Sequence, residues 1–157
     1  MCSSDLVALS AEFEGALGDG VLALDSTGAI RETTAAFLDV DPAAISFDRR
    51  DPWTVRVGTA VVGRWESRSA FLTDLTADQL LAERAPDWEQ LDGAARGRIL
   101  SAVRACLDCC PVCAGTVALD TTVVETCCRD VDVVTATCVD CEATLFEART
   151  LDDGLTA

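Results

Sequence analysis

Cys110-Pro111-Val112-Cys113 and Cys138-Val139-Asp140-Cys141 are the two segments that decide how the C-terminal part of this chain folds. Each is a Cys-x-x-Cys pair, and the 24 residues between the pairs are rich in Val and Thr, which favour β-strands. Strand pairing can therefore bring the two pairs together. Four thiolates with this spacing are typical of the tetrahedral zinc site of a zinc ribbon. We predict one zinc ion, bound by Cys110, Cys113, Cys138 and Cys141.

An overlapping pair, Cys106 and Cys109, is an alternative first half of this site. Pro111 favours Cys110 and Cys113 instead, because a proline stops the preceding helix and helps to turn the backbone so that N–H groups can point at sulfur. Cys106 lies one helical turn before Cys110, on the apolar side, and is expected to be a buried small hydrophobe. Cys109 is expected to be buried as well, or to be a free thiol.

Cys127 and Cys128 are adjacent in a segment that is predicted to be a strand, where neighbouring side chains point to opposite faces. They are therefore not expected to chelate one ion as a pair. A second metal site that uses Cys106, Cys109 and one of these two is an alternative to simple packing.

The predicted site and the composition both argue against catalysis. Four thiolates close the coordination sphere of a zinc ion, whereas a catalytic zinc keeps one position for water. Iron, as in rubredoxin, is the alternative metal, but around these cysteines only Phe146 is available for the aromatic core of such a site. The chain has no His, Lys, Tyr or Asn, which excludes a Ser-His-Asp triad, a P-loop lysine and a pyridoxal Schiff base. We expect a protein that is not an enzyme.

The chain is strongly acidic, and its cations are all of one kind. It has 27 acidic and 12 basic residues, a net charge of −15, and every basic residue is Arg. Such a composition is typical of proteins from a salt-accumulating cytoplasm, because at molar salt the Debye length is about 3 Å and repulsion between carboxylates is largely screened. The acidity argues neither for nor against a nucleic-acid partner, since the electrostatic part of such binding is weak at high salt.

Residues 110–146 resemble the small zinc-ribbon proteins of haloarchaea. The resemblance rests on Cys-Pro-Val-Cys, on the second Cys pair and on the acidic composition without lysine. It implies a bound metal ion, and it implies no particular activity. In many such knuckles a Gly follows the second Cys, whereas Ala114 and Glu142 stand there in this chain.

A length of 157 residues allows one compact domain with a small appendage. We predict an α+β fold, with an N-terminal domain of antiparallel hairpins packed with helices in residues 1–105, a zinc ribbon in residues 106–150 and a flexible tail in residues 151–157. No apolar run reaches the roughly 18 residues that span a bilayer, and Asp5 stands where a signal peptide has a cation. We expect a cytoplasmic protein without membrane contact.

The N-terminal part is predicted to begin with a helix and a hairpin. The helix is capped near Ser3 and ends at the glycines of residues 18–20. Residues 21–24 and 29–31 then read as the two strands of a hairpin. Residues 20–38 faintly resemble the opening of a PAS sensor domain, and this resemblance implies small-molecule sensing.

Residues 47–68 combine aromatic and basic side chains. Strands are predicted at residues 54–57 and 60–65. Five Arg stand against three acidic residues, a net charge of +2, and three aromatic residues are interleaved with them. An anionic partner or a stacked base can dock on such a stretch. In the alternative interpretation, the aromatic rings belong to the core and the Arg side chains pair with nearby acids.

Helices are predicted between this stretch and the cysteines. One covers residues 77–83, and another starts at Asp92 and is expected to pack on the N-terminal sheet through an apolar stripe of Ala95, Ile99, Leu100, Val103 and Leu107. Four strands are predicted in the cysteine region, at residues 116–119, 122–128, 131–137 and 143–147.

Three classes of function fit these observations. The first is a non-enzymatic adaptor or regulator, whose zinc ribbon contacts a protein or a nucleic acid. The second is a thiol redox or metal-handling protein that uses the spare cysteines Cys106, Cys109, Cys127 and Cys128. The third is a PAS-like small-molecule sensor, which needs a cavity in the N-terminal domain.

Overall fold

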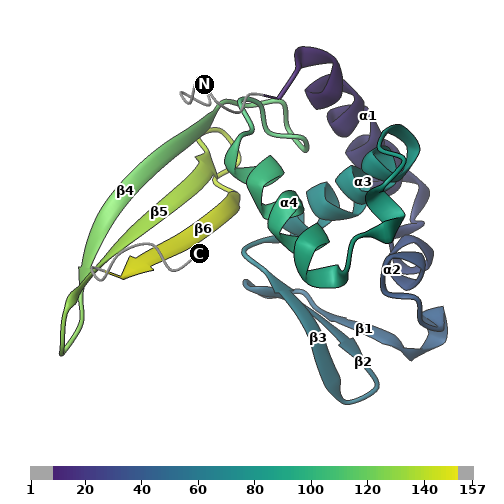
Figure 1. The fold of residues 1–157 in the computed structure, drawn as a ribbon, viewed down its shortest axis with the longest axis horizontal. Helices are drawn as coiled ribbons and strands as arrows, with labels where there is room; N and C mark the ends of the chain where they lie inside the picture. Colours follow the sequence, from purple (N-terminus) through teal and green to yellow (C-terminus); the bar gives the residue numbers. More distant parts are fainter. Residues whose placement is uncertain (1–8, 152–157) are drawn as a thin grey trace.

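The computed structural model describes residues 9–151, which form α-helices and two antiparallel sheets (Figure 1). The helices are α1 (Ala11–Thr27), α2 (Ile30–Leu38), α3 (Arg68–Arg84) and α4 (Gly93–Ala105), with short 3-10 helices at Pro42–Ala44 and Trp88–Gln90. One sheet has the order β1 (Ile45–Asp48), β2 (Trp53–Val57), β3 (Ala60–Trp65), and the other β4 (Val117–Glu125), β5 (Asp130–Cys138), β6 (Thr144–Leu151). The predicted α+β class is confirmed.

Two predictions fall on the ends of the chain. Leu151 ends β6, and the rest of the predicted tail lies outside the described residues, as does the predicted helix cap near Ser3. None of the helices in residues 9–151 has the length and apolar character that a membrane span requires.

Helix α1 begins at the Ser10 cap, whose side-chain oxygen accepts a hydrogen bond from the Phe13 N–H at 3.1 Å. It continues through residues 18–20, where the sequence predicted its end, and the prediction was wrong for a tertiary reason. A Cβ at Gly20 would collide with the Thr76 side chain of α3. Gly20 therefore permits the close approach of two helices and does not end one.

The predicted hairpin of residues 21–31 was also wrong. Val21 and Leu24 are buried side chains on one face of α1, and Ile30 opens α2 after a left-handed Gly28 (φ 69°). A short apolar run fits a buried helix segment as well as a strand, and here the helix continues. The resemblance to a PAS opening consequently loses the hairpin on which it rested.

The N-terminal sheet contains the two predicted strands, β2 and β3, and one that was not predicted, β1. Trp53 pairs with Trp65 across β2 and β3, and both indoles are buried. Their ring centroids lie 5.6 and 4.9 Å from that of Phe71 on α3. The interpretation of these tryptophans as core residues is confirmed, because they fasten α3 to the sheet.

Helices α3 and α4 form the centre of the molecule. Helix α3 starts at the Ser67 cap, well before the predicted residue 77, and α4 starts at the predicted Asp92 cap, which accepts from the Ala95 N–H at 2.7 Å. The expected packing of the α4 stripe on the N-terminal sheet was wrong. Leu100, Val103 and Leu107 instead pack in one core cluster with residues of α1, α3 and the C-terminal sheet, and Ile99 is 39% exposed.

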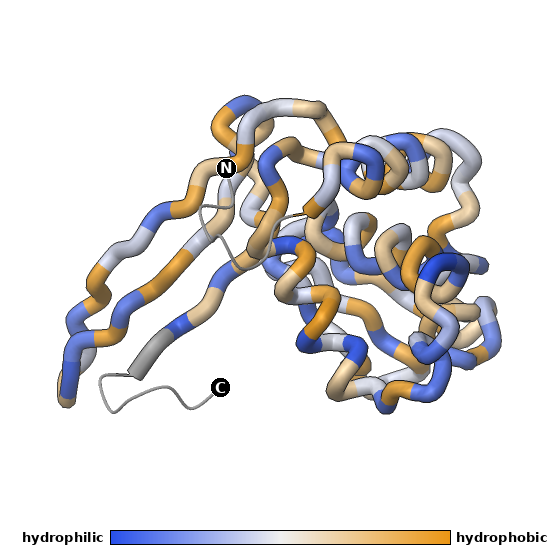
Figure 2. The backbone as a smooth tube through the Cα atoms, turned by 45° about the horizontal axis from the view of Figure 1, so that its top comes forward, coloured by the Kyte–Doolittle hydropathy of each residue, from blue (hydrophilic) through white to orange (hydrophobic). Residues whose placement is uncertain are grey.

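The C-terminal sheet extends away from the helices, as Figures 1 and 2 show. Strand β4 is continuous through Asp120, where a turn was predicted, and every residue of β4 after Val117 is exposed. The near end of the sheet, where Val117 pairs with Cys138, contributes to the core shared with α4. The far end is the β4–β5 turn.

Arg104 joins this sheet to the helices from a buried position on α4. Its guanidinium donates to the Asp74 carboxylate of α3 at 2.8 Å, to Glu66 at 2.6 Å and to the Leu145 carbonyl of β6 at 2.7 Å. One side chain of α4 therefore contacts both the start of the α3 region and β6, which are far apart in sequence. The apolar stripe predicted for α4 does not include Arg104, because Arg side chains are rarely buried unless they are paired.

Candidate metal centre

The two Cys-x-x-Cys pairs meet at the near end of the C-terminal sheet. The sulfur atoms of Cys110, Cys113, Cys138 and Cys141 all lie within 4.8 Å of one another. The Cys110 and Cys141 sulfur atoms are 3.9 Å apart, and those of Cys113 and Cys138 are 3.4 Å apart, so each close contact joins one pair to the other. The structure thus brings together all four residues that the sequence singled out.

Each pair lies in a knuckle, a tight turn built in the same way at both positions. The residue after the second cysteine donates its N–H to the carbonyl of the first, from Ala114 to Cys110 at 2.9 Å and from Glu142 to Cys138 at 3.0 Å. Both of these residues are left-handed, with φ of 62° and 63°. Glycine adopts this conformation most easily. Both turns nevertheless keep it, although the usual glycine is missing.

Backbone N–H groups point at the sulfur atoms. Gly115 donates to the Cys113 sulfur at 3.4 Å, and Cys141 donates to the Cys138 sulfur at 3.5 Å. Such contacts stabilise the thiolate form that a metal ion requires. The knuckles therefore supply partial positive charge as well as the correct spacing.

Gly115, which follows the first knuckle, lies directly against the second. A Cβ at this position would lie 2.9 Å from the Cys138 sulfur and 2.8 Å from the Asp140 Cβ. The neighbouring Thr116 accepts from the Val139 N–H at 2.9 Å, which locks the second knuckle against the first. A side chain at position 115 would separate the ligands.

The four thiols differ in their affinity for protons. Burial raises the pKa of Cys110 to about 12 and also raises that of Cys141. At Cys138 burial acts in the same direction, but hydrogen bonds from the N–H groups of Cys141 and Asp140 outweigh it and bring the pKa to about 7. A metal ion that binds here displaces protons, so its affinity increases with pH.

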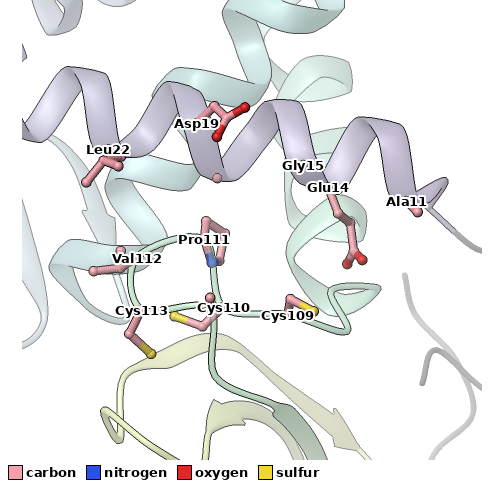
Figure 3. Close-up of a pocket in the computed structure, with 12 residues that line it drawn as sticks. Ala11, Glu14, Gly15, Asp19, Leu22, Cys109, Cys110, Pro111, Val112 and Cys113 are labelled. Carbon is pink, nitrogen blue, oxygen red and sulfur yellow. The ribbon is translucent and has the colours of Figure 1, made fainter.

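The first knuckle packs against α1 (Figure 3). A Cβ at Gly18 would lie 3.8 Å from the Pro111 carbonyl oxygen, and Pro111 lies between the helix and the sulfur atoms of Cys110 and Cys113. A cavity of about 530 Å³ remains beside this contact, between α1 and the loop of residues 109–114. Cys109 lines the cavity and does not belong to the cluster.

The structure corrects some of the expectations for the spare cysteines. Cys106, the C-cap of α4, is half-buried, not fully buried, whereas Cys109 is an exposed free thiol, which was one of its two expected states. Cys127 and Cys128 lie in the β4–β5 turn, which the Thr126 N–H closes by donating to the Arg129 carbonyl at 3.0 Å.

Because Cys127 and Cys128 are in a turn, their side chains do not point to opposite faces of a strand. Both are exposed, and their sulfur atoms are 3.3 Å apart. The turn lies at the opposite end of the β4–β5 hairpin from Cys138, so a second metal site that combines one of them with Cys106 and Cys109 is wrong. The polar Thr126–Asp130 segment between two Val-rich strands was the signal for this turn.

A metal ion fits the donor set of the cluster. Four thiolates with opposed, converging directions satisfy the requirements of a soft, four-coordinate ion, and no carboxylate or water is needed to complete the sphere. The cluster can therefore hold a metal ion that is fully enclosed by protein sulfur.

Two family models match the chain. The model for the central domain of a family of unknown function, DUF8054, matches residues 2–105, and the model for the C-terminal domain of the same family matches residues 108–148. No curated protein and no solved structure matches the chain. The second match contains all four clustered cysteines. The chain therefore belongs to the DUF8054 family, of which it contains the central and C-terminal domains.

Proposed function

We propose that this chain is a non-enzymatic adaptor or regulatory protein whose C-terminal ribbon is held together by one structural zinc ion. The observation that supports this is the convergence of four cysteine sulfur atoms within 4.8 Å, two from each knuckle. Zinc suits the site because it accepts four thiolates in tetrahedral geometry and needs no other ligand.

A catalytic role for the same ion is disfavoured by its ligands. Four thiolates leave no position for a water molecule, and the chain has no His or Lys to act as a general base or nucleophile beside it. The proposed function of the metal is therefore to fix the ribbon against α1 and α4.

The surface of the ribbon favours a protein partner over a nucleic acid. Strand β4 is an edge strand whose Leu119, Val123 and Val124 are exposed, with Asp120 and Glu125 as its charged residues. An edge strand with exposed apolar side chains can accept a strand from another protein. The lysine-free composition supports a cytoplasm of high salt as the place where this contact forms.

The zinc proposal is tested by metal analysis of the purified chain in molar KCl. We expect one tightly bound zinc per chain, and loss of β-sheet circular dichroism when a strong chelator removes it. Cys113→Ser should abolish stoichiometric zinc. Cys109→Ser is the matched control, because Cys109 is an exposed cysteine four positions earlier that lies outside the cluster. Equal zinc loss in both variants, or a chain that keeps its sheet without metal, would contradict the proposal.

A second candidate function follows from the exposed Cys127–Cys128 pair. The sulfur atoms are 3.3 Å apart at the tip of the hairpin, so a low-molecular-weight disulfide can oxidise them. One thiolate attacks this disulfide and releases a thiolate, and the second protein thiolate then displaces the other half. The protein gains one S–S bond, and the oxidant gains the two electrons and two protons as two thiols.

This thiol function is tested separately from zinc binding. Mass spectrometry after exposure to oxidised glutathione should show the loss of two hydrogen atoms, in a peptide that contains both Cys127 and Cys128, with zinc content unchanged. Cys127→Ser should prevent the change. If the two thiols stay reduced over the whole range of disulfide concentration, this candidate is excluded.

A further inference from the structure

We propose that a surface cavity in the N-terminal domain binds a small aromatic phosphate, such as a nucleoside monophosphate. The cavity has a volume of about 430 Å³ and lies where the starts of α2 and α3 meet β1 and β2. Its wall includes the aromatic residues Phe47 and Trp53 and the cations Arg31, Arg49 and Arg68. This inference is independent of the metal site.

The first argument is the local charge. Three of the chain's twelve cations line one cavity of a protein with a net charge of −15. Of these three, Arg68 is paired with Asp25 at 2.6 Å, and Arg49 has no hydrogen-bond or ion-pair partner among the described residues. The cavity therefore has an excess of about two positive charges, which matches the charge of a phosphate monoester at neutral pH.

The second argument is how the cations are held. The Arg31 guanidinium lies 5.5 Å from the centre of the Phe47 ring and donates to the carbonyls of Pro42 and Ile45. The Arg68 guanidinium lies 6.0 Å from the Trp53 ring. Contacts with a ring and with carbonyls fix Arg31 without neutralising it, so it remains able to bind an anion, whereas Arg68 is paired with Asp25.

The third argument is an indole N–H that lacks an acceptor. Trp53 is 4% exposed, and its Nε1 has no hydrogen-bond partner. The other two tryptophans do have one, since Trp65 donates to Asp74 at 2.8 Å and Trp88 donates to Asp78 at 2.9 Å. Buried donors are rarely left unpaired in proteins. Trp53 lines the cavity, and a ligand oxygen would supply the missing acceptor where the buried edge of the ring becomes accessible from it.

The size and the rings of the cavity define the ligand further. Pockets of roughly 300–1,000 Å³ are typical of small-molecule sites, and this one is at the lower end. Two of the seven lining residues are aromatic: Phe47 is half-buried, and Trp53 is buried with its ring centroid 5.6 Å from those of both Phe47 and Phe71. A planar base can pack beside the Phe47 ring while its phosphate reaches Arg49.

The test uses adenosine 5′-monophosphate as the probe, with the zinc-loaded chain at the lowest salt that keeps it folded. We expect saturable binding by calorimetry, weaker binding of adenosine and of inorganic phosphate, and a decrease in affinity as salt increases. Arg49→Gln should weaken binding about tenfold, the usual worth of one charged hydrogen bond.

Arg50→Gln is the matched control for that variant. Arg50 is the next residue, its side chain is 89% exposed and paired with Asp48 at 3.3 Å, and it does not line the cavity. The control removes the same charge and should change the affinity by less than about twofold. Equal effects of the two variants would mean that binding depends only on general charge attraction, which would overturn the proposal. The absence of saturable binding would also overturn it. Circular dichroism and zinc content check that both variants are folded.

Discussion

At the scale of single residues, the knuckles contain a strain that the sequence does not relieve. Ala114 and Glu142 are left-handed, a conformation that costs a residue with a Cβ roughly 1–2 kcal/mol. A metal ion that binds all four sulfur atoms would hold both turns in this conformation. The strain is thus supported by the ligand cluster and not by local preference.

Replacing either residue by glycine should therefore stabilise the zinc-loaded protein. We expect Ala114→Gly and Glu142→Gly each to raise the free energy of unfolding by about 0.5–1 kcal/mol, after the larger backbone entropy of glycine in the unfolded chain is subtracted. Denaturant unfolding measures this. Ala95→Gly, inside α4, is the control and should lower stability by about 1 kcal/mol. A loss of stability in both knuckle variants would show that the left-handed turns are not strained.

Gly115 leads to the opposite prediction. Gly115→Ala places a Cβ 2.9 Å from the Cys138 sulfur, so the knuckles must move apart and zinc should be lost to a chelator at least about tenfold faster. Gly97→Ala serves as the control, because nothing lies within 4 Å of its Cβ position and the change should stabilise α4. Unchanged zinc retention in Gly115→Ala would mean that the approach of the knuckles is looser than the structure has it.

The four clustered cysteines were predictable from their spacing together with Pro111, and the hairpin-tip pair was not. Cys-x-x-Cys spacing is a local property that survives any small error in strand boundaries. The relation between Cys127 and Cys128 depends on where the strand ends. Strand β4 ends at Glu125, three residues before the predicted end, so the two side chains are neighbours in a turn and not on opposite faces of a strand.

At the scale of elements, the predictions that held were those with a local signal. Asp92 was predicted to start α4 and is its N-cap. The predicted strands β2 and β3 are joined by a turn at the left-handed Gly58. The predicted end of α1 was too early, because the low helix propensity of Gly20, taken alone, indicates the end of a helix. Its actual role is set by Thr76, 56 positions away in the chain, and no local pattern reports such a contact.

Arg104 ties three elements together, and its removal should be costly. Arg104→Leu leaves the Asp74 carboxylate buried without its cation, and we expect a loss of about 3–5 kcal/mol in the free energy of unfolding. Arg104→Lys should rescue little, because one ammonium cannot replace a fork that reaches Asp74, Glu66 and the Leu145 carbonyl. Arg98→Leu, an exposed change on the same helix, should have an effect within about 0.5 kcal/mol.

The pH dependence of the Arg104→Leu variant provides a further check. Burial already raises the pKa of Asp74, with Arg104 opposing the rise, so removal of Arg104 should raise it more. In the variant the folded state then binds a proton more tightly than the unfolded state. Its deficit in stability should be largest at neutral pH and should shrink as pH falls through the raised pKa. A deficit that is constant between neutral and acid pH would mean that Asp74 is not the source of the loss.

At the scale of the whole molecule, the sequence predicted an α+β fold with a β-rich cysteine region, but it did not predict how the cysteine region packs on the N-terminal part. The joint is made by α4, whose Leu100, Val103 and Leu107 pack beside Cys110 and Cys138, and by the buried Arg104. The sequence of a hydrophobic stripe does not indicate which of two sheets the stripe packs against. The answer depends on long-range packing, and here the cluster of cysteines and the helix share one core.

The net charge of −15 determines how this whole assembly responds to salt. Repulsion between carboxylates acts over the entire surface, and raising KCl from about 0.2 M to 2 M shortens the Debye length from about 7 Å to about 2 Å. We expect a gain of about 3 kcal/mol in stability for the zinc-loaded chain, which is an increase in the melting temperature of about 6–12 °C for a chain of this size. Sucrose at the same osmolality is the control, because it favours compact states without screening charge. If sucrose and KCl raise the melting temperature equally, surface charge is not what limits stability at low salt. If only KCl raises the melting temperature, the stability of the fold depends on the screening of its acidic surface by the salt.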